Sequence, residues 1–417
     1  MSGTNGTWAV IAGGGTGGHV EPALAVAGAL VRSGHRADEI HFVGSARGME
    51  ARLVPEAGYG ITLLPGRGIQ RGRDLRARWL SARAVAGLVA ATFASVWILA
   101  RRRPAVVFSV GGYAALPCTL AAVVLRVPFV VAEPNSVPGA ANRLVGRFAR
   151  AAAVAFPGTG MHGEVVTGVP LRDEIESVGR DAESRRRARS GLGLPQGRWV
   201  LGVTGGSLGA RRINEAIVDL AERWRKRDDL ALHHVVGRRD FPEIGHAIPW
   251  GVEDRDGAPP GAAPGAPPTG SEVPDGLWYR AVEFERRMPA LLAAADVMVC
   301  RAGASTVAEL ATVGVPAVLV PLPNSPGDHQ GANARAMAAA GAAVVLPDAD
   351  CTGERLEDLL DGLFEDGARL EEMGAAGRRL ARPGGAARIA ELLELHARPV
   401  RRPRHPEGGA PGVRGSR

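Results

Sequence analysis

The sequence predicts an α/β protein with two Rossmann-like, doubly wound domains that face an interdomain cleft. Short strand-like runs rich in Val, Ile or Phe alternate with helix-like segments along most of the 417 residues. Such alternation is typical of βαβ units, which build a parallel sheet with helices on both faces. The pattern stops at a charged segment near the middle of the chain and then restarts. Each half opens with a strand, a glycine-rich turn and a helix.

The first half contains the strands and helices expected of one such domain. Its first strand ends at Ala12, before the glycines of residues 13–18. Further strands are expected at 39–44, 60–65, 105–111, 129–133 and 151–156, with helices at 22–33, 47–57, 79–100, 114–125 and 138–148. Binding sites in sheets of this kind lie at the carboxyl ends of the strands.

The charged segment at 173–196 is the expected domain boundary. It assigns residues 1–172 to an N-terminal domain and 173–380 to a C-terminal domain, which a terminal helix at 381–397 follows. Strands are expected at 199–204, 230–237, 278–284, 297–301, 316–321 and 342–346, with helices at 210–226, 288–295, 305–313 and 329–340. The Pro/Gly-rich residues 241–276 are expected to form a mobile surface insertion, and the Arg-rich tail at 398–417 is expected to be disordered.

The formal net charge of +7 comes from two local stretches. Residues 67–103 hold nine arginines and one aspartate, and the tail holds six arginines and one glutamate. The rest of the chain is acidic in total, so no nucleic acid is expected as a partner. The cysteines Cys118, Cys300 and Cys351 lack metal-ligand spacing and are typical of reduced thiols in a cytoplasmic protein. No signal peptide is expected.

Residues 84–100 carry no charge and have arginines on both sides. They are too short and too rich in Ala for a transmembrane helix, which needs roughly 20 strongly apolar residues. Two alternatives remain. The segment is a buried helix, or it is a helix whose aromatic residues, including Phe93 and Trp97, lie with the arginines on an anionic membrane surface.

Three glycine-rich turns follow strand-like runs: GGGTGGH at 13–19, GGY at 111–113 and GGSLGAR at 205–211. Where such a turn opens a helix, free backbone N–H groups and the positive end of the helix dipole favour a phosphate. The first turn fits neither a Walker A loop nor, except loosely, a dinucleotide fingerprint. Three such turns in one cleft can hold a nucleotide diphosphate and a second phosphorylated molecule.

Two helices of the second half carry candidate sugar-binding side chains. Glu309 lies early in the helix within CRAGASTVAEL at 300–310, where a carboxylate can accept hydrogen bonds from sugar or ribose hydroxyls. Gln330 and Asn333, in DHQGANA at 328–334, share one helix face, where their amides can bond a sugar. The alternative for each is a capping or solvated role.

Taken in order, these segments resemble the MurG family of bacterial UDP-N-acetylglucosamine:undecaprenyl-pyrophosphoryl-N-acetylmuramyl-pentapeptide N-acetylglucosaminyltransferases. AEPNSVPGAANR at 132–143 and GVPLR at 168–172 belong to the same resemblance, which spans nearly the whole chain outside the insertion and the tail. It implies a GT-B fold and inverting transfer of GlcNAc from UDP-GlcNAc to the 4-hydroxyl of undecaprenyl-pyrophosphoryl-MurNAc-pentapeptide (lipid I). The product is the β-1,4-linked disaccharide lipid II of peptidoglycan synthesis.

The resemblance also implies where the substrates bind. Donor-binding residues would be Gly15, Thr16, Gly17, Asn135, Arg172, Ser207, Ala304, Ser305, Thr306, Glu309 and Gln330. Acceptor-binding residues would be Gly18, Gly111, Gly112 and Tyr113. Because a polyprenol-linked acceptor is held in the bilayer, we expect peripheral attachment to the anionic, cytoplasmic side of the cell membrane.

The reaction needs a base for the acceptor hydroxyl and positive character for the departing UDP. His19 is the candidate base, because a helix N-terminus disfavours the imidazolium and leaves the ring able to accept a proton; Glu133 is the alternative. The helix N-termini at Ser207 and Ser305, with Arg172, are expected to stabilise the leaving diphosphate. Neither an obligatory metal bound through an Asp-x-Asp motif nor a cofactor is expected.

The sequence departs from the family at two places and leaves other functions open. Residues 114–117 (AALP) stand where the tyrosine loop usually continues with Ser-Gly-Pro, and Glu285 stands where the family has an aliphatic residue beside the uracil. The alternatives are another GT-B enzyme, either a diacylglycerol glycosyltransferase or a UDP-GlcNAc 2-epimerase, and a non-catalytic nucleotide-binding scaffold. An epimerase acts on UDP-GlcNAc without lipid, and a scaffold binds it without turnover.

Overall fold

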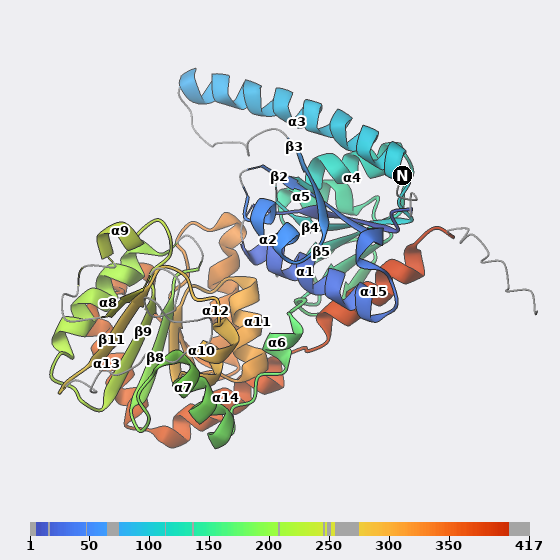
Figure 1. Cartoon of the computed structure of the whole chain (residues 1–417). Helices are drawn as coiled ribbons and strands as arrows, with labels where there is room; N and C mark the ends of the chain where they lie inside the picture. Colours follow the sequence, from blue (N-terminus) through green and yellow to red (C-terminus); the bar gives the residue numbers. More distant parts are fainter. Residues whose placement is uncertain are drawn as a thin grey trace, which may run out of the picture.

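Two seven-stranded parallel sheets, one in each half of the chain, form the framework of the computed structural model (Figure 1). The structure describes residues 6–15, 17–46, 48–64, 75–112, 114–135, 137–206, 209–244, 247, 252–254 and 275–399, without the side chains of 75–85, 252–254 and 326. Helices cover both faces of each sheet. The predicted fold class, two doubly wound Rossmann-like domains, is confirmed.

The strands of the N-terminal sheet run in the order β3-β2-β1-β4-β5-β6-β7, all parallel. They are β1 (Ala9–Gly13), β2 (Ile40–Ser45), β3 (Gly60–Leu64), β4 (Val106–Gly111), β5 (Phe129–Glu133), β6 (Ala151–Val154) and β7 (Glu164–Val166). The helices are α1 (Gly17–Arg32), the 3₁₀ turn η1 (Ala37–Glu39), α2 (Glu50–Glu56), α3 (Leu75–Arg102), α4 (Ala115–Val124) and α5 (Ala140–Gly146). The strand order reverses between β1 and β4, and ligands bind outside the strand ends at such a switch point.

The C-terminal sheet has the order β10-β11-β9-β8-β12-β13-β14 and reverses between β8 and β12. Its strands are β8 (Trp199–Thr204), β9 (Leu230–Val235), β10 (Val252–Asp254), β11 (Trp278–Val282), β12 (Val297–Cys300), β13 (Ala317–Leu319) and β14 (Ala343–Val345). Its helices are α8 (Arg211–Arg223), α9 (Phe241–Ile244), α10 (Met288–Ala294), α11 (Ala304–Val313), η2 (Pro326–Asp328), α12 (His329–Ala339), η3 (Asp348–Asp350), α13 (Gly353–Phe364) and α14 (Gly367–Leu380).

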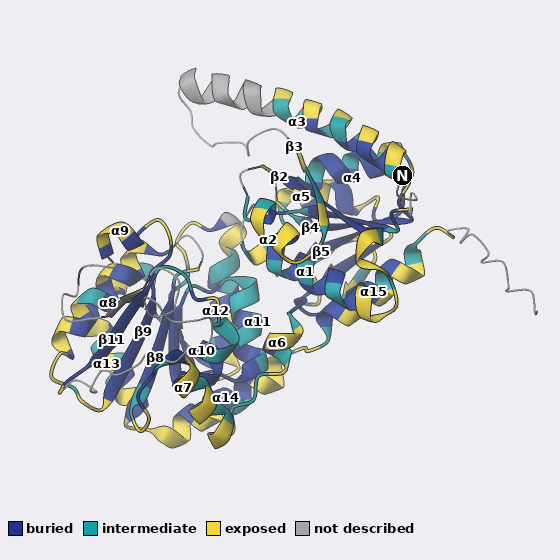
Figure 2. Ribbon diagram, in the orientation of Figure 1, coloured by how far each residue is buried: buried dark blue, intermediate teal, exposed yellow. Residues whose placement is uncertain are grey.

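Alternating residues of each central strand enter opposite cores, which explains the continuous apolar runs in the sequence. In β1, Ala9 and Ile11 join the cluster under α1, whereas Val10 and Ala12 join the cluster under α3 and α4. A strand that is covered on both faces has no polar side, because successive side chains point to opposite faces. Figure 2 shows the strands of both sheets as buried throughout most of their length.

The chain crosses between the domains twice. The first crossing leads through α6 (Asp173–Glu176) and α7 (Ala182–Leu192), and the second leads to α15 (Gly385–His396). α15 lies against α1 (Figure 1), and its fully buried Ile389 and Leu393 belong to the apolar cluster of the N-terminal sheet. Arg388 joins the two crossings, since its guanidinium donates to the carbonyl oxygens of Thr167 and Pro383 at 2.6 and 2.7 Å. The terminal helix therefore completes the N-terminal core.

The prediction of a mobile insertion at 241–276 is wrong for part of the segment. Phe241 and Ile244 of α9 are buried in the core of the C-terminal domain, and Val252–Asp254 pair with β11 as a seventh strand. These two short elements were not predicted because most of the segment has a Pro/Gly-rich composition. Residues 255–274 of the insertion and 400–417 of the tail lie outside the described residues.

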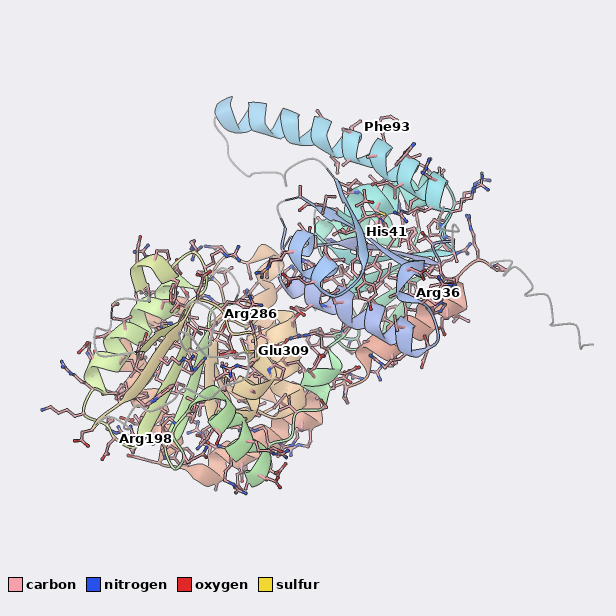
Figure 3. The ribbon with its side chains drawn as sticks, viewed as in Figure 1. Arg36, His41, Phe93, Arg198, Arg286 and Glu309 are labelled. Carbon is pink, nitrogen blue, oxygen red and sulfur yellow. The ribbon has the colours of Figure 1, made fainter. Side chains whose placement is uncertain are left out.

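The long helix α3 has one buried face and one exposed apolar face. It buries Ala91, Ile98 and Leu99 toward α4, and it exposes Val89, Phe93 and Trp97, which follow one another at every fourth residue. Figure 3 shows Phe93 on the outer side of this helix. In the part of the chain that the structure describes, no helix combines the length and hydrophobicity needed to cross a bilayer.

Candidate active site

The glycine turns after β1 and β4 contact each other at the switch point of the N-terminal sheet. The N–H group of Gly14 donates to the carbonyl oxygen of Gly111 at 3.3 Å. Gly112 has a φ of +82°, and a side chain there would overlap the carbonyl oxygen of Gly14. Only glycine permits this conformation together with so close an approach of two backbones. The two turns therefore form one continuous surface.

A buried carboxylate that the sequence analysis missed lies beneath the first turn. Glu50, the first residue of α2, accepts the N–H of Gly15 through Oε2 and the N–H of Ser45 through Oε1, both at 2.7 Å. Glu50 is 2% exposed. The sequence predicted that the N–H groups of the turn are free for a phosphate; this is wrong for Gly14 and Gly15, whose N–H groups are used inside the protein.

The N-terminus of α1 still offers helix-end N–H groups to this surface, since the first four N–H groups of a helix have no partner within the helix. Gly17 and Gly18 form its first turn, and Gly18 is exposed. The groups suited to an anion are therefore the N–H groups at the start of α1, and not those of Gly14 and Gly15 in the turn before it.

His19 lies on the first turn of α1 with its ring against the second glycine turn. A Cβ atom on Gly111 would come within 3.2 Å of Cδ2 and Nε2 of the ring. Burial lowers the pKa of His19 below its ordinary value of 6.5, while the carboxylates of Glu133 and Glu50 act in the opposite direction. The ring is therefore mainly neutral at pH 7 and can accept a proton.

Glu133, the last residue of β5, orders the loop that follows it. Its Oε1 accepts the backbone N–H and the Nδ2 of Asn135 at 3.1 and 3.0 Å. Its Oε2 accepts the N–H of Gly139 and the Nδ2 of Asn142, both at 2.9 Å. A carboxylate has about four lone-pair sites, so these four bonds occupy its capacity. Asn135, a predicted donor-binding residue, is held in place by this carboxylate.

Arg172 and Glu309 lie where the two domains meet. The Nε of Arg172, in the first crossing, pairs with Oε2 of Glu21 on α1 at 3.1 Å. Figure 3 shows Glu309 on α11, on the side of the C-terminal domain that faces the N-terminal domain. Burial raises the pKa of Glu309 to about 7; Arg172 lowers it and Glu21 raises it. Three charged groups from α1, the crossing and α11 are therefore close enough to influence one another.

The turn after β12 delivers the N-terminus of α11 to the switch point of the C-terminal sheet. Gly303 is the N-cap residue, and no side chain caps the helix. Ala304, Ser305 and Thr306 form the first turn and are half-buried. Such an uncapped N-terminus at a switch point is suited to a phosphate.

Gln330 and Asn333 share one face of α12, as predicted, but both amides bond to the protein. The Oε1 of Gln330 accepts the N–H of Leu322 at 2.9 Å. The Nδ2 of the buried Asn333 donates to the carbonyl oxygen of Ala302 at 3.1 Å. Asn333 therefore holds the turn that precedes α11, and half-buried Gln330 holds the loop before α12.

Three predicted site residues, Thr16, Tyr113 and Ser207, lie outside the described residues.

The structure also describes the two places where the sequence departs from the family pattern. In the loop that follows Tyr113, Ala114 and Ala115 are buried at the start of α4. The carboxylate of Glu285 is also buried. It pairs with Nε2 of His233 at 3.0 Å and accepts the N–H of Arg287 at 2.7 Å. These bonds hold the pKa of Glu285 below its usual value although burial alone would raise it.

An Asp-x-Asp sequence does occur in the C-terminal domain, at 348–350. Its first carboxylate is paired, because Oδ1 of Asp348 lies 2.5 Å from Nη1 of Arg301. Within the described ranges, no three His, Cys, Asp or Glu side chains are grouped closely enough to hold a metal ion.

Comparisons with known proteins agree with this geometry. Residues 9–154 match the glycosyltransferase family 28 N-terminal domain, and residues 200–389 match the family 28 C-terminal domain. A UDP-N-acetylglucosamine–N-acetylmuramyl-(pentapeptide) pyrophosphoryl-undecaprenol N-acetylglucosamine transferase from Acidothermus cellulolyticus is 40% identical over 390 residues, covering 93% of this chain and 97% of the relative. The enzyme of the same name from Desulforudis audaxviator is 35% identical over 390 residues, with 92% and 97% covered.

Solved structures give the same result at the level of the fold. The crystal structure of Acinetobacter baumannii MurG superposes with a TM-score of 0.67 at 29% identity, covering 93% of this chain and 99% of that one. A Neisseria meningitidis UDP-GlcNAc 2-epimerase bound to UDP-GlcNAc superposes with a TM-score of 0.57 at 13% identity, covering 93% and 99%. The second likeness extends to the fold alone.

Proposed function

We infer the reaction of this protein from its family: the chain belongs to glycosyltransferase family 28, among its N-acetylmuramyl-(pentapeptide) pyrophosphoryl-undecaprenol N-acetylglucosamine transferases. It transfers GlcNAc from UDP-GlcNAc to undecaprenyl-pyrophosphoryl-MurNAc-pentapeptide. The product is the β-1,4-linked disaccharide lipid II. The GT-B fold expected from the resemblance is present. The observation that carries the function is the full-length match to these transferases, combined with a switch-point turn in each domain whose following helix, α1 or α11, carries one of the interdomain charges Glu21 and Glu309.

We propose that the acceptor pyrophosphate binds at the joined turns of the N-terminal domain. Gly18, Gly111 and Gly112 would face it, with Tyr113 beside them. The helix start at Gly17 and Gly18 supports this assignment, because helix N-termini attract anions. The contact between the two turns supports it further, since one surface then reaches both the anion and the ring of His19.

The donor is proposed to bind mainly to the C-terminal domain. The uncapped first turn of α11, made by Ala304, Ser305 and Thr306, would receive the diphosphate, and Glu309 one turn later would accept the ribose hydroxyls. Further donor contacts are proposed for Gly15, Thr16, Gly17, Asn135, Arg172, Ser207 and Gln330. In this arrangement Arg172 exchanges its pairing with Glu21 for the charge of the departing diphosphate.

His19 is our proposed general base. Its ring is mainly neutral at pH 7 and lies at the joined turns, whereas Glu133 already receives four hydrogen bonds from its own loop. The ring nitrogen takes the proton from the 4-hydroxyl of MurNAc as that oxygen attacks the anomeric carbon of GlcNAc. The bond to the UDP oxygen breaks with inversion, and the helix N-terminus of α11 stabilises the negative charge.

We propose that α3 attaches the enzyme peripherally to the anionic, cytoplasmic side of the membrane. Val89, Phe93 and Trp97 form its exposed stripe, and the guanidinium of Arg101 stacks over the Trp97 ring at 5.6 Å. Exposed aromatics next to cations are suited to the interface between lipid headgroups and acyl chains. The stripe lies on the domain that is proposed to bind the lipid-linked acceptor.

The role of His19 is tested by kinetics of GlcNAc transfer to a short-chain analogue of the lipid-linked acceptor. His19→Ala should lower kcat roughly 10²- to 10⁴-fold, the usual contribution of a general base, with little change in the KM for UDP-GlcNAc. In the wild-type pH profile of kcat/KM, the midpoint of the acid limb should lie below pH 6.5. This limb should be absent from the profile of the variant. Glu133→Gln is the comparison: an equal loss of kcat there, with the acid limb intact in His19→Ala, would make Glu133 the base.

A further inference from the structure

We propose that Glu50 is a positioning residue for the transfer reaction: its buried carboxylate fixes the first glycine turn, from which the helix that carries His19 starts. This inference rests on the proposed role of His19. Nothing in the matched motifs includes Glu50, which is 35 residues away in sequence from the turn that it holds.

The first part of the argument is the geometry of the two bonds. Glu50 receives the N–H of Ser45, at the end of β2, and the N–H of Gly15, beyond the end of β1. One carboxylate therefore joins the ends of the adjacent strands β1 and β2, beside the switch point between β1 and β4. Hydrogen bonds to a charged acceptor are about twice as strong as neutral ones, and a buried carboxylate without them would be unfavourable. The turn is held in a single conformation.

The second part is the space that the fold reserves for this side chain. Cβ atoms at Gly14, Gly44 and Gly48 would all overlap Glu50. Three glycines from three segments thus surround it. Gly44 lies within β2 and has no positive φ, so its missing side chain serves packing and not backbone conformation.

The third part is the charge next to the base. His19 is approached by Glu50 from α2 and by Glu133 from the end of β5. On its own helix, Glu21 pairs with Arg172 across the domain junction, where Glu309 also lies. Beyond the C-terminal end of α1, His35 pairs with Glu394 of α15. The two buried carboxylates offset part of the lowering of the His19 pKa that burial of the ring causes.

Two substitutions distinguish the effect of the negative charge of Glu50 from the effect of the position of its carboxylate. Glu50→Gln keeps the size but removes the charge and one of the two acceptor oxygens, so the acid limb of the kcat/KM profile should move to lower pH and kcat should fall roughly tenfold. Glu50→Asp keeps the charge but retracts it by one methylene, so kcat should fall while the acid limb stays near its wild-type position. Gly44→Ala, which displaces the side chain without strain in the backbone, should behave as Glu50→Asp does. Glu56→Gln, the same change at an exposed site of α2, is the matched control and should behave as wild type.

A measurement on the unaltered protein keeps the proposal testable if these variants do not fold. Gly15 is exposed, so its amide hydrogen should exchange quickly unless the bond to Glu50 protects it. Slow exchange at Gly15 and Ser45 is expected. Rapid exchange at Gly15, or a Glu50→Gln variant with wild-type kcat and pH profile, would overturn the proposal. An inactive wild-type enzyme with a protected Gly15 amide would instead contradict the proposed function.

Discussion

Glu309 shows how one residue links binding chemistry to stability. Its carboxyl group has a pKa of about 7 in the folded protein against 4.5 for an ordinary glutamate, chiefly because of burial. Between these two pH values the folded state binds the proton and the unfolded state does not. The free energy of unfolding therefore decreases as pH rises from about 4.5 to about 7. Above pH 7 the ionised carboxylate destabilises the folded protein.

Replacing Glu309 by Gln should remove this destabilisation, because the amide carries no charge. At pH 8 the variant should be more stable than wild type, on the order of 1 to 3 kcal/mol given the size of the shift, and at pH 4.5 the two should be equal. The same change should raise the KM for UDP-GlcNAc, because the ribose hydroxyls lose a charged acceptor. Urea unfolding at both pH values with donor kinetics checks this; a variant that is less stable at pH 8 would disprove the burial argument.

At this scale, the sequence analysis found candidate residues on helices that follow glycine turns and missed a residue from another element. His19 and Glu309 lie in the first two turns of such helices, so strand–turn–helix geometry places them near the strand ends. Glu50 comes from a helix beneath the neighbouring strand, and only the three-dimensional pairing of β1 with β2 brings it to Gly15. Its signal in the sequence, Gly44 and Gly48 just before it, is too general to indicate a carboxylate site.

Among the elements, α3 is distinguished by an apolar stripe that nothing in the described structure covers. Phe93 is 72% and Trp97 63% exposed. Burial of an aromatic side chain contributes about 1.5 to 3 kcal/mol, which would be gained if this stripe entered the headgroup region of a membrane.

The double variant Phe93→Ser, Trp97→Ser should therefore bind anionic vesicles at least roughly tenfold more weakly than wild type. Leu395→Ser is the matched control, because Leu395 is 73% exposed but belongs to α15 and not to α3, and it should leave binding unchanged. Sedimentation with vesicles of phosphatidylglycerol and of phosphatidylcholine measures the effect. Equal binding of the double variant and wild type, or indifference to anionic lipid, would contradict the membrane role of α3.

The elements with strong apolar periodicity were predicted to within a few residues, and those with weak patterns were not. β5 and β8 match the expected ranges 129–133 and 199–204, since both are mainly apolar runs with clear limits, Pro128 and Pro134 for β5 and Arg198 and Gly205 for β8. α1 begins at Gly17, which agrees with the expected place of His19 on its first turn but precedes the apolar run expected at 22–33, and Pro22 lies inside the helix. β10 was missed because its three residues depend on pairing with β11.

For the molecule as a whole, the terminal helix shows that the domains are not simple sequence blocks. Strands β1–β7 precede Arg172 and strands β8–β14 follow it, but α15 returns from the C-terminal domain to cover the N-terminal sheet. Composition and periodicity predict a helix there. They give no information on the domain against which it packs, because an amphipathic helix can cover either sheet.

Ile389→Ala should consequently weaken the N-terminal domain, although the residue follows the C-terminal domain in sequence. Loss of a fully buried isoleucine costs about 2 to 5 kcal/mol. Hydrogen exchange should accelerate in β1, β4 and β5 and should stay unchanged in β8 and β12. Leu363→Ala, in the core of the C-terminal sheet, should give the opposite pattern, and uniform acceleration in both sheets for either variant would contradict the independence of the two cores.

The central claim is that the two domains together transfer GlcNAc to a lipid-linked muramyl acceptor. The most direct test incubates the purified full-length chain with labelled UDP-GlcNAc, with and without a short-chain analogue of undecaprenyl-pyrophosphoryl-MurNAc-pentapeptide, and analyses the products. The account predicts UDP release only when the acceptor is present, together with a β-1,4-linked disaccharide on the lipid. Conversion or hydrolysis of UDP-GlcNAc without acceptor, or binding of UDP-GlcNAc without any turnover, would contradict it.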